Sequence, residues 1–239
     1  MSLYNKIIDR QKLDAAWQKV RKNKPAAGVD RVTWEQYDEE IKENIRLLNK
    51  DLTEHTYAAL PVKEVMLYKG DKARTIALYA MRDKVVQQSL AAELTKIFDK
   101  DFSARTYAYR PGKSALSAIE DIHERIVSEK YRFFIKLDIH DFFGSIQWRQ
   151  VEQVLKTAIV EDDVLYLIRQ NACGLSLDEE SGELSEKKNG IFQGSGIAPI
   201  LSNIYLMDFD HWLTYRDDVY FMRYSDDMIV LGKDGESMK

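Results

Sequence analysis

The sequence has very little cysteine and proline, and it contains no long apolar run. A single cysteine, Cys173, among 239 residues cannot form an internal disulfide or a cysteine-rich zinc site. No stretch of about eighteen uncharged apolar residues is present, and the first residues lack the apolar segment of a signal peptide, so we expect no membrane association. Hydrophobic residues make up 45% of the chain, enough for a sizeable core. We therefore expect a soluble, folded, cytoplasmic protein.

The chain also lacks an excess of basic residues. Its formal net charge is −4, and the acidic residues gather in residues 161–239. A protein that grips a nucleic-acid backbone usually carries a basic stripe, because its side chains replace the counterions of the phosphates. Composition alone thus disfavours a nucleic-acid partner, unless basic side chains are concentrated locally or are supplied by something outside this chain.

Apolar spacing predicts helices in the first half of the chain, over residues 9–23, 33–48, 83–98 and 114–128. Thr33 and Gln36 form a capping box at the start of the second helix, and Asp83 is the expected N-cap of the third. The fourth helix is expected to bury Leu116, Ile119, Ile122 and Ile126.

Two further segments have hairpin-like patterns, one with basic residues near its tip and one that is acidic. Residues 61–78 contain two β-prone runs, with Lys69, Lys72 and Arg74 at or near the tip between them. Residues 175–190 resemble an acidic hairpin or an exposed loop, with Gly182 near the turn. Residues 148–172 between them have a helical pattern, as does the segment that follows Pro199.

Acidic residues lie at the ends of three strand-like runs. Residues 131–139 alternate, which places Asp138 on the face opposite the apolar stripe of Phe133, Ile135 and Leu137. The runs 219–224 and 228–232 flank Asp226 and Asp227, and we expect them to form a tight hairpin with the acids in its turn.

Adjacent carboxylates repel each other unless a cation neutralises them. The alternative for Asp226 and Asp227 is an ordinary solvated turn, since Asp is common in turns. Asp138 favours the first interpretation, because strands disfavour Asp unless it has a role there. Three carboxylates are suitable ligands for Mg²⁺, and two such ions can stabilise both oxygens of a phosphoryl displacement.

Five segments resemble, in order and approximate spacing, the blocks of bacterial reverse transcriptases, most nearly those of the group II intron type. The segments are RTIALYAMRDKVVQQSL, YAYRPGKSALSAI, IKLDIHDFFGSI, FQGSGIAPILSNIYL and FMRYSDDMIVL. The stretch LDAAWQKVRKNKPAAGVDRVTW is similar to the N-terminal extension of that group. Five ordered blocks are a specific signal, whereas the Tyr-x-Asp-Asp string alone would be a weak one.

This resemblance implies an α+β fold, with the fingers and palm of a right-hand polymerase and a ferredoxin-like antiparallel palm sheet packed on helices. Residues 1–112 would form the fingers with the N-terminal extension. Residues 113–239 would form the palm core, with a fingers-side excursion at about 148–190. The family continues beyond this point into the rest of the palm and a thumb, which is absent from this chain, so we expect weak polymerisation from the chain alone.

The resemblance also implies a metal site. Asp138, Asp226 and Asp227 would be the catalytic carboxylates and would bind two Mg²⁺ ions, for which Mn²⁺ could substitute. The carbonyl of Ile139 would be an extra ligand. This assignment requires that folding bring the side chain of Asp138 within a shared ion's reach of the other two acids.

Other positions match nucleotide-binding residues of the family. Lys72 and Arg74 would contact the triphosphate. Phe143 would lie under the incoming sugar and block a 2′-hydroxyl, with ordinary core packing as the alternative. Gln193 and Gly194 would lie beside the nucleotide and the template base, where the glycine lets the backbone approach the substrate.

Two residues match positions near the template and primer. Arg110 resembles a residue that braces the fingers and the template strand, and a structural hydrogen-bonding role is an equal alternative. Tyr224 would pack near the primer end or simply fill the core. Ser225 stands where group II enzymes usually have alanine, so a small residue is kept.

The implied function is RNA-directed DNA synthesis, in which dNTPs are added to a primer 3′-hydroxyl. The partners would be an RNA template, a DNA or RNA primer and dNTP, with intron RNA or a fused or associated accessory domain as further partners in a bacterial cytoplasm. One alternative is an RNA-binding maturase or retroelement scaffold in which polymerisation is secondary. Another is a nucleotide cyclase with a ferredoxin-like core, which the Gln193-Gly194 block disfavours.

Overall fold

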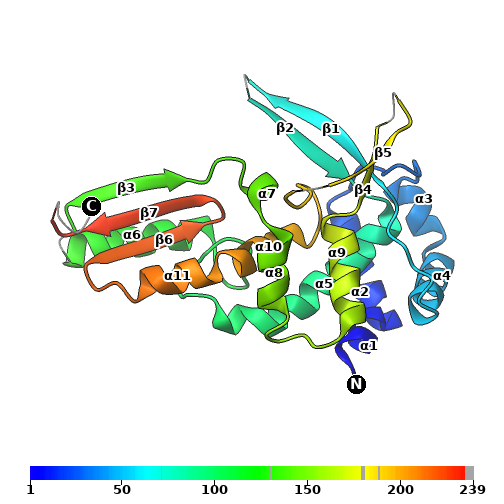
Figure 1. Cartoon of the computed structure of the whole chain (residues 1–239), viewed down its shortest axis with the longest axis horizontal. Helices are drawn as coiled ribbons and strands as arrows, with labels where there is room; N and C mark the ends of the chain where they lie inside the picture. Colours follow the sequence, from blue (N-terminus) through cyan, green and yellow to red (C-terminus); the bar gives the residue numbers. More distant parts are fainter. Residues whose placement is uncertain (71, 130, 179–180, 188, 235–239) are drawn as a thin grey trace. The chain divides into compact units, whose positions relative to one another are not determined.

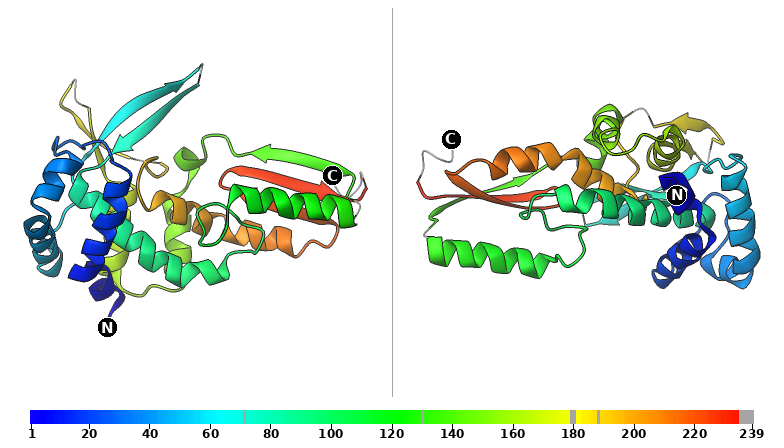
Figure 2. Two further views of the ribbon diagram at one scale, coloured as in Figure 1. Left: turned by 180° about the vertical axis from the view of Figure 1, so that it is seen from behind. Right: turned by 90° about the horizontal axis from the view of Figure 1, so that it is seen from below.

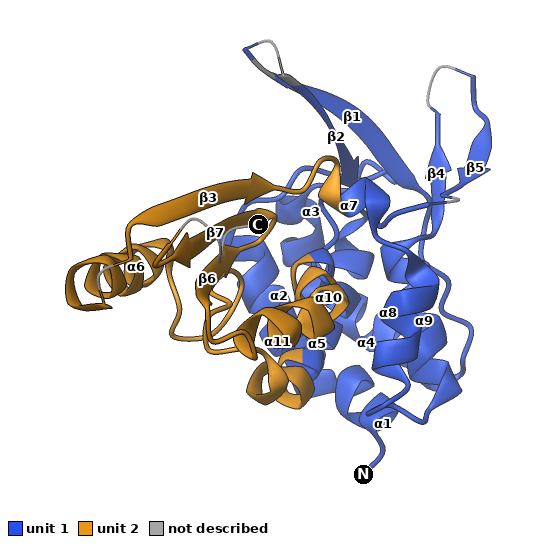
Figure 3. Ribbon diagram, turned by 60° about the vertical axis from the view of Figure 1, so that its left-hand side comes forward, with its two compact units in different colours: residues 1–94, 143–198 blue, residues 95–142, 199–239 orange. Residues whose placement is uncertain are grey.

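The computed structural model describes residues 1–239 except residues 71, 130, 179–180, 188 and 235–239, and the side chains of Lys69 and Lys72 lie outside the description. The structure is mixed α+β (Figure 1). It consists of two compact units, unit 1 with residues 1–94 and 143–198, and unit 2 with residues 95–142 and 199–239 (Figure 3). The expected fingers and palm boundaries are functional assignments and stay predictions.

Unit 1 is mainly helical. Its N-terminal helices have the expected apolar spacing, and α2 buries Leu13, Trp17 and Val20. The capping box of Thr33 and Gln36 is confirmed. The single helix expected after it is two helices, because Glu40 leaves the helical conformation at φ −108° and ψ 26°. The helices are α1 (Leu3–Ile8), α2 (Arg10–Lys22), α3 (Trp34–Glu39), α4 (Ile41–Thr53), α5 (Met81–Phe98, ending in unit 2), α8 (Trp148–Leu155) and α9 (Asp162–Ala172).

The sheet of unit 1 has the order β2-β1-β4-β5. Its strands are β1 (Val62–Lys69), β2 (Lys72–Leu78), β4 (Leu175–Leu177) and β5 (Leu184–Glu186). Both expected hairpins are present, and β1 joins them by pairing in parallel with β4. Part of each hairpin's connection, residue 71 and residues 179–180, lies outside the described residues.

The expected N-cap role of Asp83 is wrong. Asp83 lies inside the first turn of α5. Its carboxylate accepts hydrogen bonds from the Tyr57 hydroxyl at 2.7 Å and from the Leu60 backbone N–H at 3.1 Å. The side chain is fully buried, and this burial raises the pKa of Asp83 to about 6. Asp83 therefore anchors the segment that leads into β1.

Unit 2 contains the three-stranded antiparallel sheet β3-β7-β6. The packed clusters of Leu213, Phe221 and Met228 and of Tyr107, Ala118 and Met222 lie on its two faces. Helix α11 covers the first face and α6 the second (Figure 2). The strands are β3 (Phe133–Asp138), β6 (Val219–Tyr224) and β7 (Asp227–Gly232), and the helical segments are the 3-10 turn η1 (Asp99–Asp101), α6 (Ala115–Glu129), α10 (Ala198–Tyr205, beginning on the last residue of unit 1) and α11 (Met207–Thr214). The short helix α7 (Phe142–Ser145) begins on the last residue of this part of unit 2 and continues into unit 1.

The face that α6 was expected to bury is largely exposed. Leu116 is 65% exposed, Ile119 62% and Ile126 45%. The helix instead packs on the sheet through Ala118 and the partly buried Ile122. Apolar spacing predicts a stripe along a helix, but it does not say whether a neighbouring element covers that stripe.

Across the part of the chain that the structure describes, every helix is too short or too polar to serve as a membrane-crossing segment.

Candidate active site

The three acids lie at one end of the unit 2 sheet. Asp138 is the last residue of β3 and pairs across the ladder with Asp227, the first residue of β7. Asp226 lies in the tight turn between β6 and β7, and its carbonyl accepts a hydrogen bond from the Ile139 N–H at 3.3 Å. The expected strand and hairpin are thus confirmed, and the backbone brings the three positions together.

The side chains at this end are arranged around a lysine. Lys136 shares the sheet face of Asp138, and its Nζ lies 3.1 Å from Oδ1 of Asp227. This hydrogen bond raises the pKa of Lys136. Within the described ranges, no three His, Cys, Asp or Glu side chains gather closely enough to hold one ion. The convergence of the three carboxylates on a shared ion therefore stays a prediction.

The chemistry of the donors nevertheless fits a divalent cation. Ionised carboxylates offer only hard oxygen acceptors, which Mg²⁺ prefers. Asp138 and Asp227 are exposed and Asp226 is half-buried, so none of the three side chains is closed off from solvent cations. The Asp227 carboxylate already forms an ion pair with the Lys136 ammonium. A divalent cation bound to Asp227 would take the place of that ammonium group.

The turn that carries Asp226 has an unusual backbone. Ser225 has a φ of +62°, a conformation that non-glycine residues keep only when their surroundings hold it. Its hydroxyl lies 3.3 Å from the Tyr109 hydroxyl. Its carbonyl accepts a hydrogen bond at 2.9 Å from the guanidinium of Arg223, which is paired with Asp210. This pair was not predicted from the sequence, although Arg223 and Asp210 are charged residues in otherwise apolar segments.

In unit 1, the Gln193-Gly194 segment lies against β2. The Gln193 carbonyl accepts a hydrogen bond from the Ala77 N–H at 2.8 Å. Gly194 has a φ of +110°, and a Cβ there would stand 2.6 Å from the Ala77 carbonyl oxygen. The approach of β2 therefore already requires glycine at this position, and the expected approach to a substrate stays a prediction.

The cations expected to meet the triphosphate lie on β2. Arg74 is exposed, and its guanidinium makes no hydrogen bond or ion pair with the described residues. The side chain of Lys72 lies outside the described residues, so its expected role stays a prediction. Arg74 is thus available to an anion.

Phe143 lies at a junction of two segments. Its carbonyl accepts a hydrogen bond from the Ile191 N–H at 2.9 Å. Next to it, a Cβ on Gly190 would stand 2.6 Å from the Cα of Gly144. The segment after β3 and the segment before Gln193 are therefore locked together within unit 1, which fixes Phe143 close in space to the Gln193 segment.

Arg110 has the contacts of a structural residue. Its guanidinium donates to the Asp99 side chain at 2.8 Å and to the carbonyls of Asp99, Ser103 and Thr106 at 2.8, 2.6 and 3.1 Å. The structural alternative accounts for these bonds, and a template contact stays a prediction. Tyr224, the last residue of β6, is 37% exposed and pairs with Asp227, so it does not fill the core.

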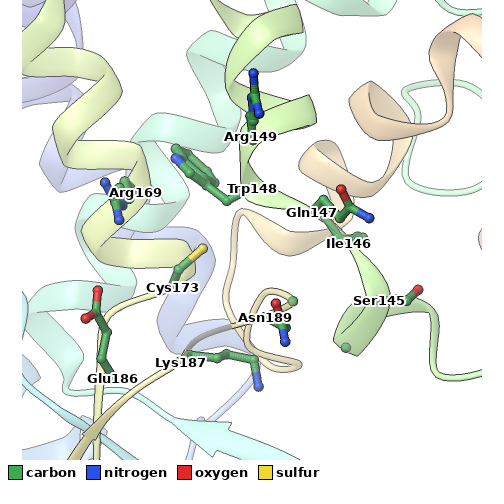
Figure 4. A pocket seen from close by; sticks show the side chains of 12 residues that line it. Ser145, Ile146, Gln147, Trp148, Arg149, Arg169, Cys173, Glu186, Lys187 and Asn189 are labelled. Atoms are coloured by element: carbon green, nitrogen blue, oxygen red, sulfur yellow. The ribbon is translucent and has the colours of Figure 1, made fainter.

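Unit 1 also contains a depression of about 550 Å³ beside the Phe143 junction (Figure 4). Arg149, Arg169 and Lys187 line it together with Glu186 and Trp148. None of the three cations forms an ion pair with a carboxylate among the described residues. Figure 4 shows the Trp148 indole extending toward Arg169. The lining is net positive, in contrast to the acidic composition of the chain as a whole.

Comparison with known proteins identifies the family. The model of the family "Reverse transcriptase (RNA-dependent DNA polymerase)" matches residues 67–239. Protein YkfC of Escherichia coli K12 is 26% identical over 193 residues, which cover 79% of this chain and 50% of that protein. The group II intron-encoded protein LtrA of Lactococcus lactis is 24% identical over 215 residues, 88% of this chain and 35% of that protein. The chain thus spans half or less of the length of these relatives.

Solved structures agree on the fold. A chain of a partial Cas6-RT-Cas1–Cas2 complex has a TM-score of 0.60 at 21% identity, and the match covers 98% of this chain and 39% of that one. The expected α+β fold is therefore confirmed. Because the family model matches most of the chain, the chain belongs to the reverse transcriptase family. It resembles the group II intron type, since its relatives include a group II intron-encoded protein.

Proposed function

We propose that this chain is the catalytic part of an RNA-directed DNA polymerase that uses a primer 3′-hydroxyl, an RNA template and dNTP. The observation that carries the proposal is the register of the unit 2 sheet. It sets Asp138 opposite Asp227, with Asp226 in the adjoining turn, in a chain whose family is defined by this reaction.

Asp138, Asp226 and Asp227 would hold two Mg²⁺ ions, with the Ile139 carbonyl as an additional ligand. When bound, the ions would neutralise charge on the attacking and leaving oxygens of the phosphoryl transfer. The three carboxylates would hold the ions at the end of the unit 2 sheet, so catalysis would come from positioning and electrostatics rather than from covalent chemistry.

The remaining residues act on the nucleotide. Arg74 and Lys72 bind the β and γ phosphates, which leave as pyrophosphate when the primer 3′-hydroxyl attacks the α-phosphate. Phe143 lies under the sugar and excludes a 2′-hydroxyl. Gln193 positions the base through its amide. The support for these roles is the position of each residue in the family's blocks and the exposure of Arg74.

Single-nucleotide addition tests the proposal. Excess protein is mixed with a primed RNA template, one complementary dNTP and MgCl₂, so that the primer ends are occupied by protein and the rate of a single addition is measured. We expect one nucleotide to be added by the wild-type chain and at least a 100-fold slower reaction with Asp226→Asn. Equal rates for the two proteins would contradict the proposal.

A second candidate function is RNA binding in which polymerisation is secondary, as in a maturase or a retroelement scaffold. The net-positive depression lined by Arg149, Arg169 and Lys187 favours it, since unpaired cations suit phosphate groups. RNA affinity measured with and without Mg²⁺ and dNTP separates the two functions. A pure binder ignores both additions, whereas a polymerase holds the primed template more tightly when dNTP is present. Product analysis with nucleoside triphosphate alone tests the cyclase alternative, which the family match disfavours.

A further inference from the structure

A fully buried ion pair lies behind the turn that carries Asp226. Arg223 and Asp210 are both 0% exposed. The guanidinium donates from Nε to Oδ1 of Asp210 at 2.8 Å and from Nη2 to Oδ2 at 2.5 Å. A buried pair of this kind is weak evidence for stability, because removing two charges from water costs about as much as their attraction returns. Its presence in unit 2 therefore calls for another explanation.

The third nitrogen of the guanidinium supplies that explanation. Nη1 donates to the carbonyl of Ser225 at 2.9 Å and to Oδ1 of Asn203 at 3.1 Å. Ser225 is the residue with a φ of +62° that immediately precedes Asp226. This carbonyl belongs to the peptide group between Ser225 and Asp226. The hydrogen bond from Arg223 restricts rotation of that peptide group, and it thereby restrains the backbone orientation of Asp226.

The groups that orient Arg223 are themselves anchored. Oδ2 of Asp210 also accepts from the Thr106 hydroxyl at 2.7 Å. Nδ2 of Asn203 donates to the Ala108 carbonyl at 2.9 Å. The backbone of Arg223 also bonds to this segment, donating to the Arg105 carbonyl at 3.0 Å. One guanidinium thus ties α10, α11, β6 and residues 105–108 to the turn.

We propose that Arg223 is a positioning residue: its guanidinium, oriented by Asp210, holds the Ser225 carbonyl and thereby aims the Asp226 carboxylate at a divalent cation. The inference rests on the proposed function, because it assigns Arg223 to the same carboxylate site. It differs from a purely structural role in predicting a loss of cation affinity without a matching loss of folding.

The test requires a variant that removes the guanidinium without leaving a buried charge. Removing one partner alone would strand the other charge in the interior and destabilise unit 2 strongly. Arg223→Met combined with Asp210→Asn leaves no charge, and the asparagine oxygen still accepts from the Thr106 hydroxyl. Ser225→Ala is the matched control, because it removes the contact with Tyr109 and keeps the carbonyl that Arg223 holds.

Two measurements on the full chain are combined. The dissociation constant of Mn²⁺ is obtained from the electron paramagnetic resonance signal of the free ion, and folding is followed by circular dichroism on heating. We expect the double variant to bind Mn²⁺ at least tenfold more weakly while melting within a few degrees of wild type. Ser225→Ala should stay within about twofold of wild type in affinity. Wild-type Mn²⁺ affinity in a folded double variant would overturn the inference.

Two further variants keep the outcome clear. Arg223→Lys preserves the buried positive charge, but an ammonium cannot bond to Asp210, Asn203 and the Ser225 carbonyl in one plane. We expect it to remain folded and to lose Mn²⁺ affinity as the double variant does, and full affinity in this variant would also overturn the inference. Asp226→Asn tests the site itself. If wild type binds Mn²⁺ no better than Asp226→Asn, the proposed metal site fails, and the role of Arg223 fails with it.

Discussion

The buried carboxyl of Asp83 should make the stability of this protein fall as the pH rises. Burial raises the pKa of Asp83 to about 6, although its bonds to Tyr57 and Leu60 and the nearby Arg82 act in the opposite direction. An aspartate in the unfolded chain ionises near pH 4. Between these values the folded state keeps a proton that the unfolded state has lost, so the free energy of unfolding decreases with rising pH.

The size of the effect follows from the two pKa values. A difference of about two pKa units corresponds to roughly 3 kcal/mol. This contribution is fully present below about pH 4 and is lost above about pH 6. Asp83→Asn removes the titration but keeps one acceptor oxygen. The other hydrogen bond is lost at every pH, at a cost of about 1 kcal/mol that does not depend on pH.

The assay is urea unfolding of wild type and Asp83→Asn at a series of pH values from 4 to 7.5. Other groups titrate equally in both proteins, so the difference in the free energy of unfolding isolates Asp83. We expect wild type to lose about 2–4 kcal/mol relative to the variant between pH 4 and pH 7. A difference that stays constant over this range would show that Asp83 has the same pKa in the folded and the unfolded protein.

Three further predictions concern the proposed nucleotide-binding residues and the proposed RNA-binding depression. Phe143→Ala should raise ribonucleotide use relative to deoxyribonucleotide use in competitive primer extension, because the ring no longer blocks the 2′-hydroxyl, and an unchanged ratio would remove its gating role. Arg74→Ala should raise the KM for dNTP by about 10- to 150-fold, since a charged hydrogen bond contributes roughly 1.5–3 kcal/mol; an unchanged KM would exclude the phosphate contact. Arg169→Gln combined with Lys187→Gln should weaken single-stranded RNA binding and reduce the slope of log affinity against log salt by about 1.4. A salt slope equal to that of wild type would exclude this depression as an RNA contact.

Local patterns predicted much of the fold. The capping box of Thr33 and Gln36 needs only neighbouring residues, and it is present as expected. The alternation of residues 131–139 predicted both the strand and the faces of Asp138 and Phe133, because side chains alternate along any strand. The hairpin around Asp226 followed from two apolar runs separated by turn residues.

Long-range partners were not predictable from these patterns. Whether a neighbour covers Leu116 depends on elements remote in the sequence, and that face is exposed. Aspartate is a residue type that favours helix N-caps, yet the Asp83 carboxylate accepts hydrogen bonds from Tyr57 and Leu60, which lie 26 and 23 positions away in the sequence. The pairing of Arg223 with Asp210 depends on how α11 packs against β6, and this packing cannot be deduced from the sequence of either segment alone. The positions of Asp138, Asp226 and Asp227 in the fold were therefore predictable from the sequence, while the contacts that hold the turn at Asp226 were not.

The central claim is that the carboxylates of Asp138 and Asp226 share a divalent cation. Crystals grown with MnCl₂ and measured at a wavelength where manganese scatters anomalously test it directly. We expect an anomalous peak within about 2.0–2.6 Å of carboxylate oxygens from both residues. A peak that touches Asp227 alone, or manganese bound only elsewhere on the chain, would contradict it.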